Sequence, residues 1–256
     1  MISRQLRFLA LFLCCNLVQA QTDSVDSFLT YDLLYNLVVT GDVNVILGES
    51  SSPNVVEYDE DGASLTYADG VMTITSVPGV SQSTVVIRSI DQFRSLSRLI
   101  VRDDSTLVAK DIRATSLSVE TKTSGNIKIE GIMNLNRLIM DNSGESEIYW
   151  VNSDELNVDM KRGDLVLGGR VDRLTLRASD EALLDATGLI SNSTWVAASG
   201  DANVQVFPLK TLYAYSKDSS IVNVKNKPDM YVPINQSPSV IVLNYIDMEK
   251  RKNTVY

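Results

Sequence analysis

Four residues in the C-terminal half have the side chains and spacing of a recognition surface. Trp195, Tyr213 and Tyr215 alternate with small or apolar residues in two short runs, and Arg177 precedes Trp195 by 18 positions. Alternation along a strand turns such aromatic side chains outward when their neighbours point into a core. Aromatic rings beside a guanidinium stack on sugar rings or anchor a protein partner. We predict a binding site for a glycan or a cell-surface protein here, with a purely structural cross-strand stack, or burial under a loop, as the alternatives.

A second set of residues concerns metal chemistry. An acidic residue recurs in five turn-like clusters, at Glu145, Asp164, Glu181, Asp201 and Asp218. Carboxylates stacked about 5 Å apart repel one another, and a bound calcium ion would relieve that repulsion. Aspartate also favours turns through bonds to nearby backbone amides, and the G-G-x-G-x-D loop of calcium-binding repeats is absent from the sequence. We therefore expect turn chemistry at these positions, with no metal and no cofactor.

The residue types exclude several kinds of catalysis. The 256 residues contain no histidine, and the only cysteines are Cys14 and Cys15. A Ser-His-Asp or Cys-His pair and a His-ligated zinc are therefore impossible. We expect no catalytic residues and a noncatalytic protein, either a binding domain or a structural domain that acts as a spacer or assembly unit.

The alternative is a carbohydrate-active enzyme, a polysaccharide lyase or hydrolase, working with carboxylates and arginine. Glu120, Asp141, Asp159 and Arg177 recur at nearly regular intervals, which predicts one outward column. Such chemistry needs several carboxylates and a base that converge in one groove. A straight column of charge on a sheet is more typical of a solvated face.

A degenerate repeat positions all of these residues. Clusters rich in Gly, Asn, Asp and Ser recur every 17 to 20 residues, and Gly, Asn and Asp tolerate the positive φ of sharp corners. A short run with period-two alternation lies before and after each cluster, as in strands with one buried face. The clusters are Ser124-Gly125-Asn126, Ser143-Gly144-Glu145, Arg162-Gly163-Asp164, Ser179-Asp180-Glu181, Ser199-Gly200-Asp201 and Lys217-Asp218-Ser219.

A unit of strand, corner, strand and loop predicts an all-β fold, a right-handed parallel β-helix or solenoid with rungs of about 19 residues. Six rungs extend from Leu117 to Val224. This arrangement requires Leu156, Leu174 and Leu212 to be buried. The same alternation places Trp150 in the core and Tyr149 outside.

The two ends are less regular. Residues 1–20 have a short basic start, an apolar stretch and a small-x-small site before Gln21, which predicts a signal peptide. We expect residues 21–256 to form one β-helix domain whose N-terminal part has wider rungs or hairpins. Residues 229–256 then supply a capping strand at Val240 to Leu243 and a polar tail.

The net charge limits the classes of partner that the chain is expected to bind. The net charge is −9, and loss of residues 1–20 reduces the basic residues from 23 to 21 against 32 acidic ones. Such a chain repels phosphate backbones, so nucleic acid is not an expected partner. Beyond the signal peptide no apolar run is long enough for an integral membrane span. We expect an exported bacterial protein of the periplasm, the cell surface or the medium.

The ordered series of corners resembles a known family, described as "putative auto-transporter adhesin, head GIN domain", over residues 28–228. Glycine-free corners at Ser179-Asp180-Glu181 and Lys217-Asp218-Ser219 depart from its pattern. The resemblance implies a bacterial, exported, β-helix-like solenoid with an adhesin-like role. The matching residues are Thr40-Gly41-Asp42-Val43, Thr123-Ser124-Gly125-Asn126, Asn142-Ser143-Gly144-Glu145, Ala198-Ser199-Gly200-Asp201 and the closing Lys225-Asn226-Lys227-Pro228.

Overall fold

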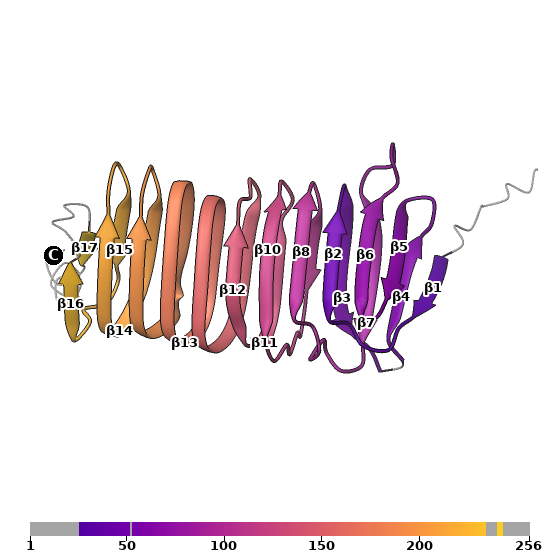
Figure 1. The fold of residues 1–256 in the computed structure, drawn as a ribbon, viewed down its shortest axis with the longest axis horizontal. Coiled ribbons are helices and arrows are strands. Elements are labelled where there is room, and N and C mark those ends of the chain that lie inside the picture. The colour runs from indigo at the N-terminus through magenta and orange to yellow at the C-terminus, as the bar shows by residue number, and fades with distance from the viewer. Residues whose placement is uncertain (1–25, 52, 234–239, 243–256) are drawn as a thin grey trace, which may run out of the picture.

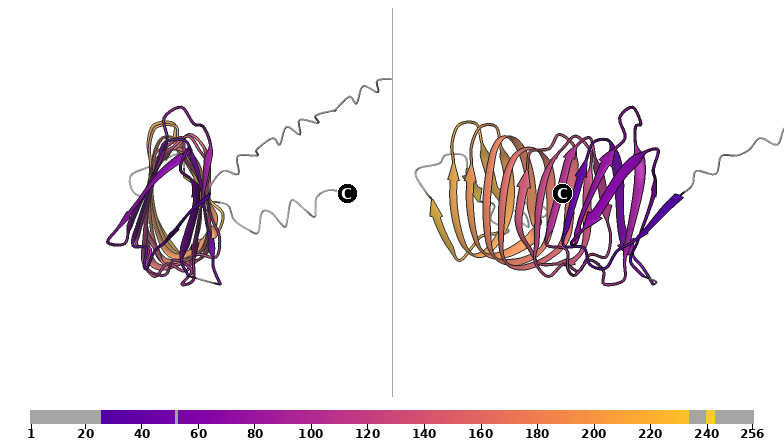
Figure 2. Two further views of the ribbon diagram at one scale, coloured as in Figure 1. Left: turned by 90° about the vertical axis from the view of Figure 1, so that its right-hand side faces the viewer. Right: turned by 45° about the vertical axis from the view of Figure 1, so that its right-hand side comes forward.

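The computed structural model describes residues 26–51, 53–233 and 240–242. This part of the chain consists of strands and turns without a helix, and its 17 strands join in one sheet. The ribbon winds about one long axis in successive turns (Figure 1), and along that axis it forms a flattened ring (Figure 2). The predicted all-β fold is confirmed. The predicted signal peptide and Leu243 lie outside the described residues.

The N-terminal part closes one end of the sheet. β2 and β3 lie between β6 and β7 on one side and β8 and β9 on the other, in parallel pairs such as Leu37 with Met72 and Leu37 with Leu99. β4 pairs antiparallel with β7 and β1, and β5 pairs antiparallel with β6. The strands are β1 Asp26–Thr30, β2 Asn36–Thr40, β3 Val43–Glu49, β4 Val55–Asp59, β5 Ala63–Ala68, β6 Val71–Ser76, β7 Ser83–Ser89, β8 Arg98–Asp103 and β9 Thr106–Ala109.

The C-terminal part is more regular. Its strands pair in parallel, and each residue faces the one a single repeat further along the chain, as Val119 faces Leu138 and Val204 faces Val222. β13 continues over 54 residues and bends around the axis (Figure 1). The strands are β10 Leu117–Thr123, β11 Ile127–Met133, β12 Leu135–Met140, β13 Glu145–Ala198, β14 Asn203–Ser216, β15 Ile221–Val224, β16 Met230–Pro233 and β17 Val240–Val242.

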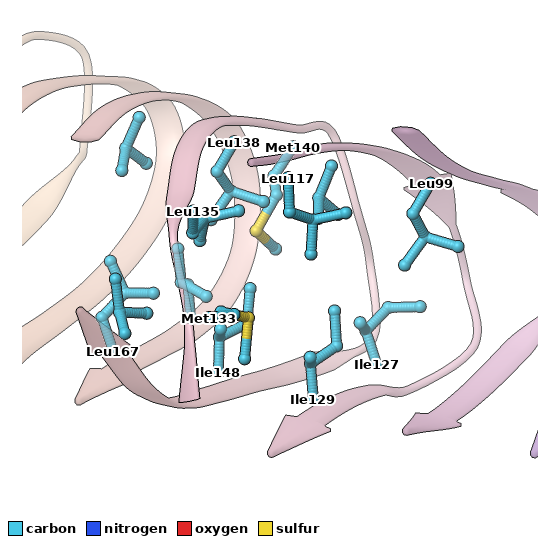
Figure 3. Packing of buried hydrophobic residues seen from close by; sticks show 14 of the residues in the cluster. Leu99, Leu117, Ile127, Ile129, Met133, Leu135, Leu138, Met140, Ile148 and Leu167 are labelled. Carbon is cyan, nitrogen blue, oxygen red and sulfur yellow. The ribbon is translucent and has the colours of Figure 1, made fainter. Parts of the chain in front are cut away.

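Aliphatic side chains fill the space inside the turns. Leu156, Leu174 and Leu212 are at most 1% exposed, so their predicted burial is confirmed. Figure 3 shows the interior near Leu117 and Ile129, where leucine, isoleucine and methionine side chains from successive strands meet. Burying a side chain of this size stabilises the fold by about 1.5–3 kcal/mol. The interior therefore holds the strands in register and leaves alternate side chains on the outside.

The corners are made in two ways. Gly163 and Gly200 have positive φ angles of 92° and 66°, and at the glycine-free corners Asp180 and Asp218 take φ values of 53° and 59°. Aspartate tolerates this left-handed region better than most residues, which explains the departure from glycine. Gly144 is required for a different reason, because a Cβ there would lie 2.4 Å from the Gly125 carbonyl oxygen.

One prediction about the core is wrong. Trp150 is 67% exposed, and Tyr149 beside it is partly exposed. The φ angle of Trp150 is 68°, which breaks the alternation at this position. Opposite it, the pairing register shifts between Glu130 and Met133, and Val151 takes the buried place. An alternation of buried and exposed residues that is continued through a corner therefore predicts the wrong side of the strand for Trp150.

Candidate functional site

One column of outward side chains crosses the C-terminal part. The register pairs Glu120 with Ile139 and Ile139 with Asp159, and it pairs Trp195 with Tyr213. Arg177 connects the two groups, because it shares a shallow pocket with Asp159 and lies over the Trp195 ring. The members, called here the outward column, are Glu120, Ile139, Asp159, Arg177, Trp195 and Tyr213.

The predicted column of four charges is wrong in one member. Ile139, not Asp141, is the partner of Glu120. The backbone N–H of Asp141 donates to the carbonyl oxygen of Thr121 at 3.0 Å, which places Asp141 beyond the column. The turns vary in length, so a constant spacing misses the column by two positions here. The column therefore contains Ile139 between its two carboxylates.

The aromatic end of the column brings the predicted residues together. Thr194 and Val196 are fully buried, so the strand turns Trp195 outward, where it is partly exposed. The guanidinium carbon of Arg177 lies 5.2 Å from the centre of the Trp195 ring, within range of a cation–π contact. Tyr213 lies opposite Trp195 on the next strand. Arg177, Trp195 and Tyr213 thus form a ladder of successive outward positions, in which the guanidinium contacts the indole and Tyr213 is the register neighbour of Trp195.

Tyr215 lies at the edge of this ladder. It is partly exposed and stands opposite Ala197, so no large side chain covers it from that neighbouring position. Both tyrosines offer a hydroxyl that donates and accepts hydrogen bonds. The aromatic face, defined as Arg177, Trp195, Tyr213 and Tyr215, therefore combines flat apolar surface with polar tips.

A shallow pocket of about 240 Å³ adjoins the aromatic face, lined by Arg137, Ile139, Asp159 and Arg177 among others. Within the described residues, Arg177 makes no ion pair with a carboxylate. The guanidinium keeps N–H donors for a ligand while its plane rests on the indole. Asp159 supplies acceptors in the same pocket.

Sequence reasoning missed a charged groove of about 590 Å³ beside the first half of the column. Arg102 Nη2 lies 3.2 Å from Glu120 Oε1, and Arg162 Nη2 lies 2.7 Å from Asp141 Oδ1. Lys122 lines the groove between these pairs. The residues come from successive turns at staggered positions, so only the register reveals their convergence. In the sequence, the alternation of Glu120 with Lys122 is the feature that indicates a charged surface here.

The acidic corner residues do not gather into a cluster. Among the residues the structure describes, no group of three or more Asp, Glu, Cys or His side chains is placed to hold a metal ion. The Asp218 carboxylate instead accepts a hydrogen bond of 3.2 Å from the backbone N–H of Gly200 on the preceding turn. At this corner, the acid stabilises the stacking of two turns.

The described residues also bear on membrane insertion. None of them forms a helix long and apolar enough to cross a bilayer.

Comparisons with known proteins agree on a family and a fold. The model of the family "Putative auto-transporter adhesin, head GIN domain" matches residues 35–228. No curated protein matches the chain. A crystal structure from Parabacteroides distasonis, described as a "putative lipid binding protein", has a TM-score of 0.68 at 14% identity and covers 86% of this chain and 97% of its own.

Two further crystal structures are described as "putative adhesin". One, from Parabacteroides merdae, has a TM-score of 0.56 at 14% identity and covers 86% of this chain and 95% of its own. The other, from Bacteroides fragilis, has a TM-score of 0.53 at 12% identity and covers 86% and 94%. At these identities the likeness shows a shared fold.

Proposed function

We propose, because the chain belongs to the "Putative auto-transporter adhesin, head GIN domain" family, that it is a noncatalytic binding domain of an exported bacterial protein. Its partner is a glycan or a cell-surface protein at or outside the cell envelope. The binding surface is the aromatic face of Arg177, Trp195, Tyr213 and Tyr215. The family description supports an adhesin-like role, and the solved structures described as adhesins share the fold.

The observation that carries this proposal is the contact between Arg177 and Trp195 at 5.2 Å, continued by Tyr213 on the next strand. A ligand ring can pack against the outer side of this ladder, between Asp159 at one end and Val232 at the other, because the aromatic side chains are partly exposed and the guanidinium keeps N–H donors. A stack that served stability alone would gain nothing from the hydrogen-bonding pocket that adjoins it.

A glycan array tests the proposal. Trp195→Ala should lower binding to the glycans that the protein recognises by about tenfold, since an aromatic anchor contributes at least about 1.4 kcal/mol. Leu183→Ala is the matched control, because Leu183 is 48% exposed and lies outside the aromatic face. If Trp195→Ala unfolds the protein, or binds as the unaltered chain does, the ladder is structural. Loss of adhesion to cells with unchanged array signals would indicate a protein partner.

The second candidate is a carbohydrate-active enzyme, and one observation favours it. The charged groove gathers Asp103, Glu120 and Asp141 with Arg102 and Arg162. The ion pairs keep Glu120 and Asp141 beside guanidinium groups. The enzyme would cleave acidic polysaccharides, releasing unsaturated or reducing ends. Release that is abolished in Glu120→Gln would establish this function and displace the binding proposal.

The finer architecture and location belong to the same proposal. We propose a right-handed β-helix with rungs of about 19 residues, the length that suits one turn of such a solenoid. The parallel pairing of Val119 with Leu138, and of Val204 with Val222, supports it. We propose a signal peptide over residues 1–20 and one domain over residues 21–256. Export from a bacterial host should yield a protein that begins at Gln21, and a product that retains Met1 would contradict this.

A further inference from the structure

Trp150 occupies a place where it contributes little to folding. It is 67% exposed, the largest exposed fraction among the large apolar side chains the structure describes. Its φ of 68° lies in the left-handed region, which strains a bulky residue and suits glycine or asparagine. A residue kept in a strained and exposed position points to a role outside the core.

A second exposed side chain lies beside it. The register pairs Glu130 with Tyr149 and Met133 with Val151, so Ile132 and Trp150 fall between these pairs on adjacent turns. Ile132 is 61% exposed, and both side chains line a pocket of about 350 Å³. Gly131 also lines it, with φ of 153°, and a Cβ there would lie 2.1 Å from the Ile112 carbonyl oxygen. The pocket therefore has an apolar wall of Ile132 and Trp150, with backbone exposed at Gly131.

Polar groups line the rest of the pocket. Asp111 and Arg113 are exposed, and in the described part of the chain their side chains make no ion pair or hydrogen bond with another residue. Glu130 forms an ion pair with Lys128 through Oε1, at 3.2 Å, which leaves Oε2 as an acceptor for a ligand. Two carboxylates and a guanidinium thus offer both acceptors and donors beside the indole.

This combination selects one class of ligand. The volume lies at the low end of small-ligand pockets, about 300–1,000 Å³, which suits one or two rings and not a protein surface. C–H groups of a sugar ring pack on the negative face of an indole, and its hydroxyls donate to carboxylates and accept from guanidinium. Asp111 and Glu130 are balanced by Arg113 and by Lys128 beside Glu130, so no net charge attracts an acidic sugar. We propose that the corner at Trp150 binds a neutral pyranose ring of a glycan, separately from the aromatic face.

Tryptophan fluorescence tests this site directly. The chain has two tryptophans, so Trp195→Phe leaves Trp150 as the only reporter. In this variant, the probes are neutral oligosaccharides of mannose, glucose and galactose, with oligogalacturonate as the acidic comparison. A neutral sugar should reduce acrylamide quenching of Trp150 by about twofold, because a stacked ring shields one face of the indole.

Two variants separate binding from stability. In the Trp195→Phe chain, Trp150→Asn should abolish the response to the same neutral sugar, measured by calorimetry, and leave the melting temperature unchanged or higher because asparagine tolerates the left-handed backbone. Asp111→Asn should weaken binding by about fivefold, since it removes a charged acceptor. Ile90→Asn is the control, because Ile90 is 58% exposed and does not line the pocket.

Three results would overturn the proposal. The first is acrylamide quenching of Trp150 that stays unchanged with every neutral oligosaccharide at millimolar concentration. The second is a fall in the melting temperature of Trp150→Asn, which would make Trp150 structural. The third is a blue shift of Trp150 with phosphatidylcholine vesicles but not with sugars, which would assign the corner to a lipid surface. None of these results bears on the aromatic face, since Trp195 is already replaced in the fluorescence assay.

Discussion

The N-terminal and C-terminal parts of the sheet differ in how far apart in sequence their paired strands lie. From β10 onward, parallel partners lie one repeat apart along the chain, as Val119 and Leu138 do. The parallel partners of β2 and β3 are much further apart in sequence, as Leu37 and Leu99 are, and the N-terminal part also contains antiparallel pairs. Nearly constant turns let one outward residue per turn fall into a column, so a recognition surface can be built from single positions. The N-terminal part lacks this constant turn length, and its strands β1, β4 and β5 cover the end of the sheet.

Aromatic residues show the same difference. In the N-terminal part Tyr31 and Phe93 are buried, at 6% and 1% exposure. In the C-terminal part the interior is aliphatic, and Trp150, Trp195 and Tyr213 all lie at least partly outside. Buried aromatic rings therefore occur in the N-terminal part, where Tyr35 is nevertheless 44% exposed, and the C-terminal core is built from aliphatic side chains.

Backbone contacts between stacked corners should make Gly144 more sensitive to a small change than a glycine within a strand. Gly144→Ala should lower the free energy of unfolding by about 3 kcal/mol, because its Cβ would meet the Gly125 carbonyl oxygen at 2.4 Å. Gly48→Ala in β3 is the matched change, since nothing lies within 4 Å of its Cβ, and it should shift the value by less than about 0.5 kcal/mol. Urea denaturation measures both. Equal effects would show that the stacked corner at Gly144 accommodates a methyl group at little cost.

The N-terminal part contains a buried tyrosine that should lower stability in alkali. Burial raises the pKa of Tyr31, whose hydroxyl donates to the Arg88 carbonyl oxygen at 2.9 Å. A folded-state pKa above the unfolded value means that the native state holds its proton longer, so stability is retained below about pH 10 and falls above it. Urea midpoints at successive alkaline pH values should fall more steeply for the unaltered chain than for Tyr31→Phe. Parallel curves would show that Tyr31 ionises as freely as in the unfolded chain.

Arg177 should have the smallest effect on stability and a clear effect on binding. Arg177→Gln removes the cation–π contact, so the free energy of unfolding should fall by about 0.5 kcal/mol and glycan affinity by about fivefold. Arg173→Gln is the control, since Arg173 pairs with Glu155 at 2.9 Å and lies outside the aromatic face. Affinity that falls equally in both variants would indicate a general charge effect.

Much of the C-terminal part could be predicted from the sequence. The corner clusters and the alternation around Leu174 depend on local backbone chemistry, which a single sequence displays. The opposition of Trp195 and Tyr213 follows from the same spacing. Where a turn departs from the average, the prediction drifts, which is why Asp141 was placed in the column occupied by Ile139.

The remainder depends on long-range pairing. Nothing local signals that Leu37 in β2 lies beside Leu99 in β8, with five other strands between them in the sequence. The positive φ of Trp150 strains the backbone at one corner, and the residue type does not predict it. The charged groove likewise exists only once Arg102, Lys122 and Arg162 are brought together by the register.

The affinity of the Trp195→Ala variant for the best array glycan, measured by calorimetry beside its melting temperature, tests the central claim most directly. The aromatic face at Arg177, Trp195 and Tyr213 predicts a loss of about tenfold or more with the fold intact. An unchanged dissociation constant in a folded variant would contradict the claim, and binding would then have to lie elsewhere on the protein.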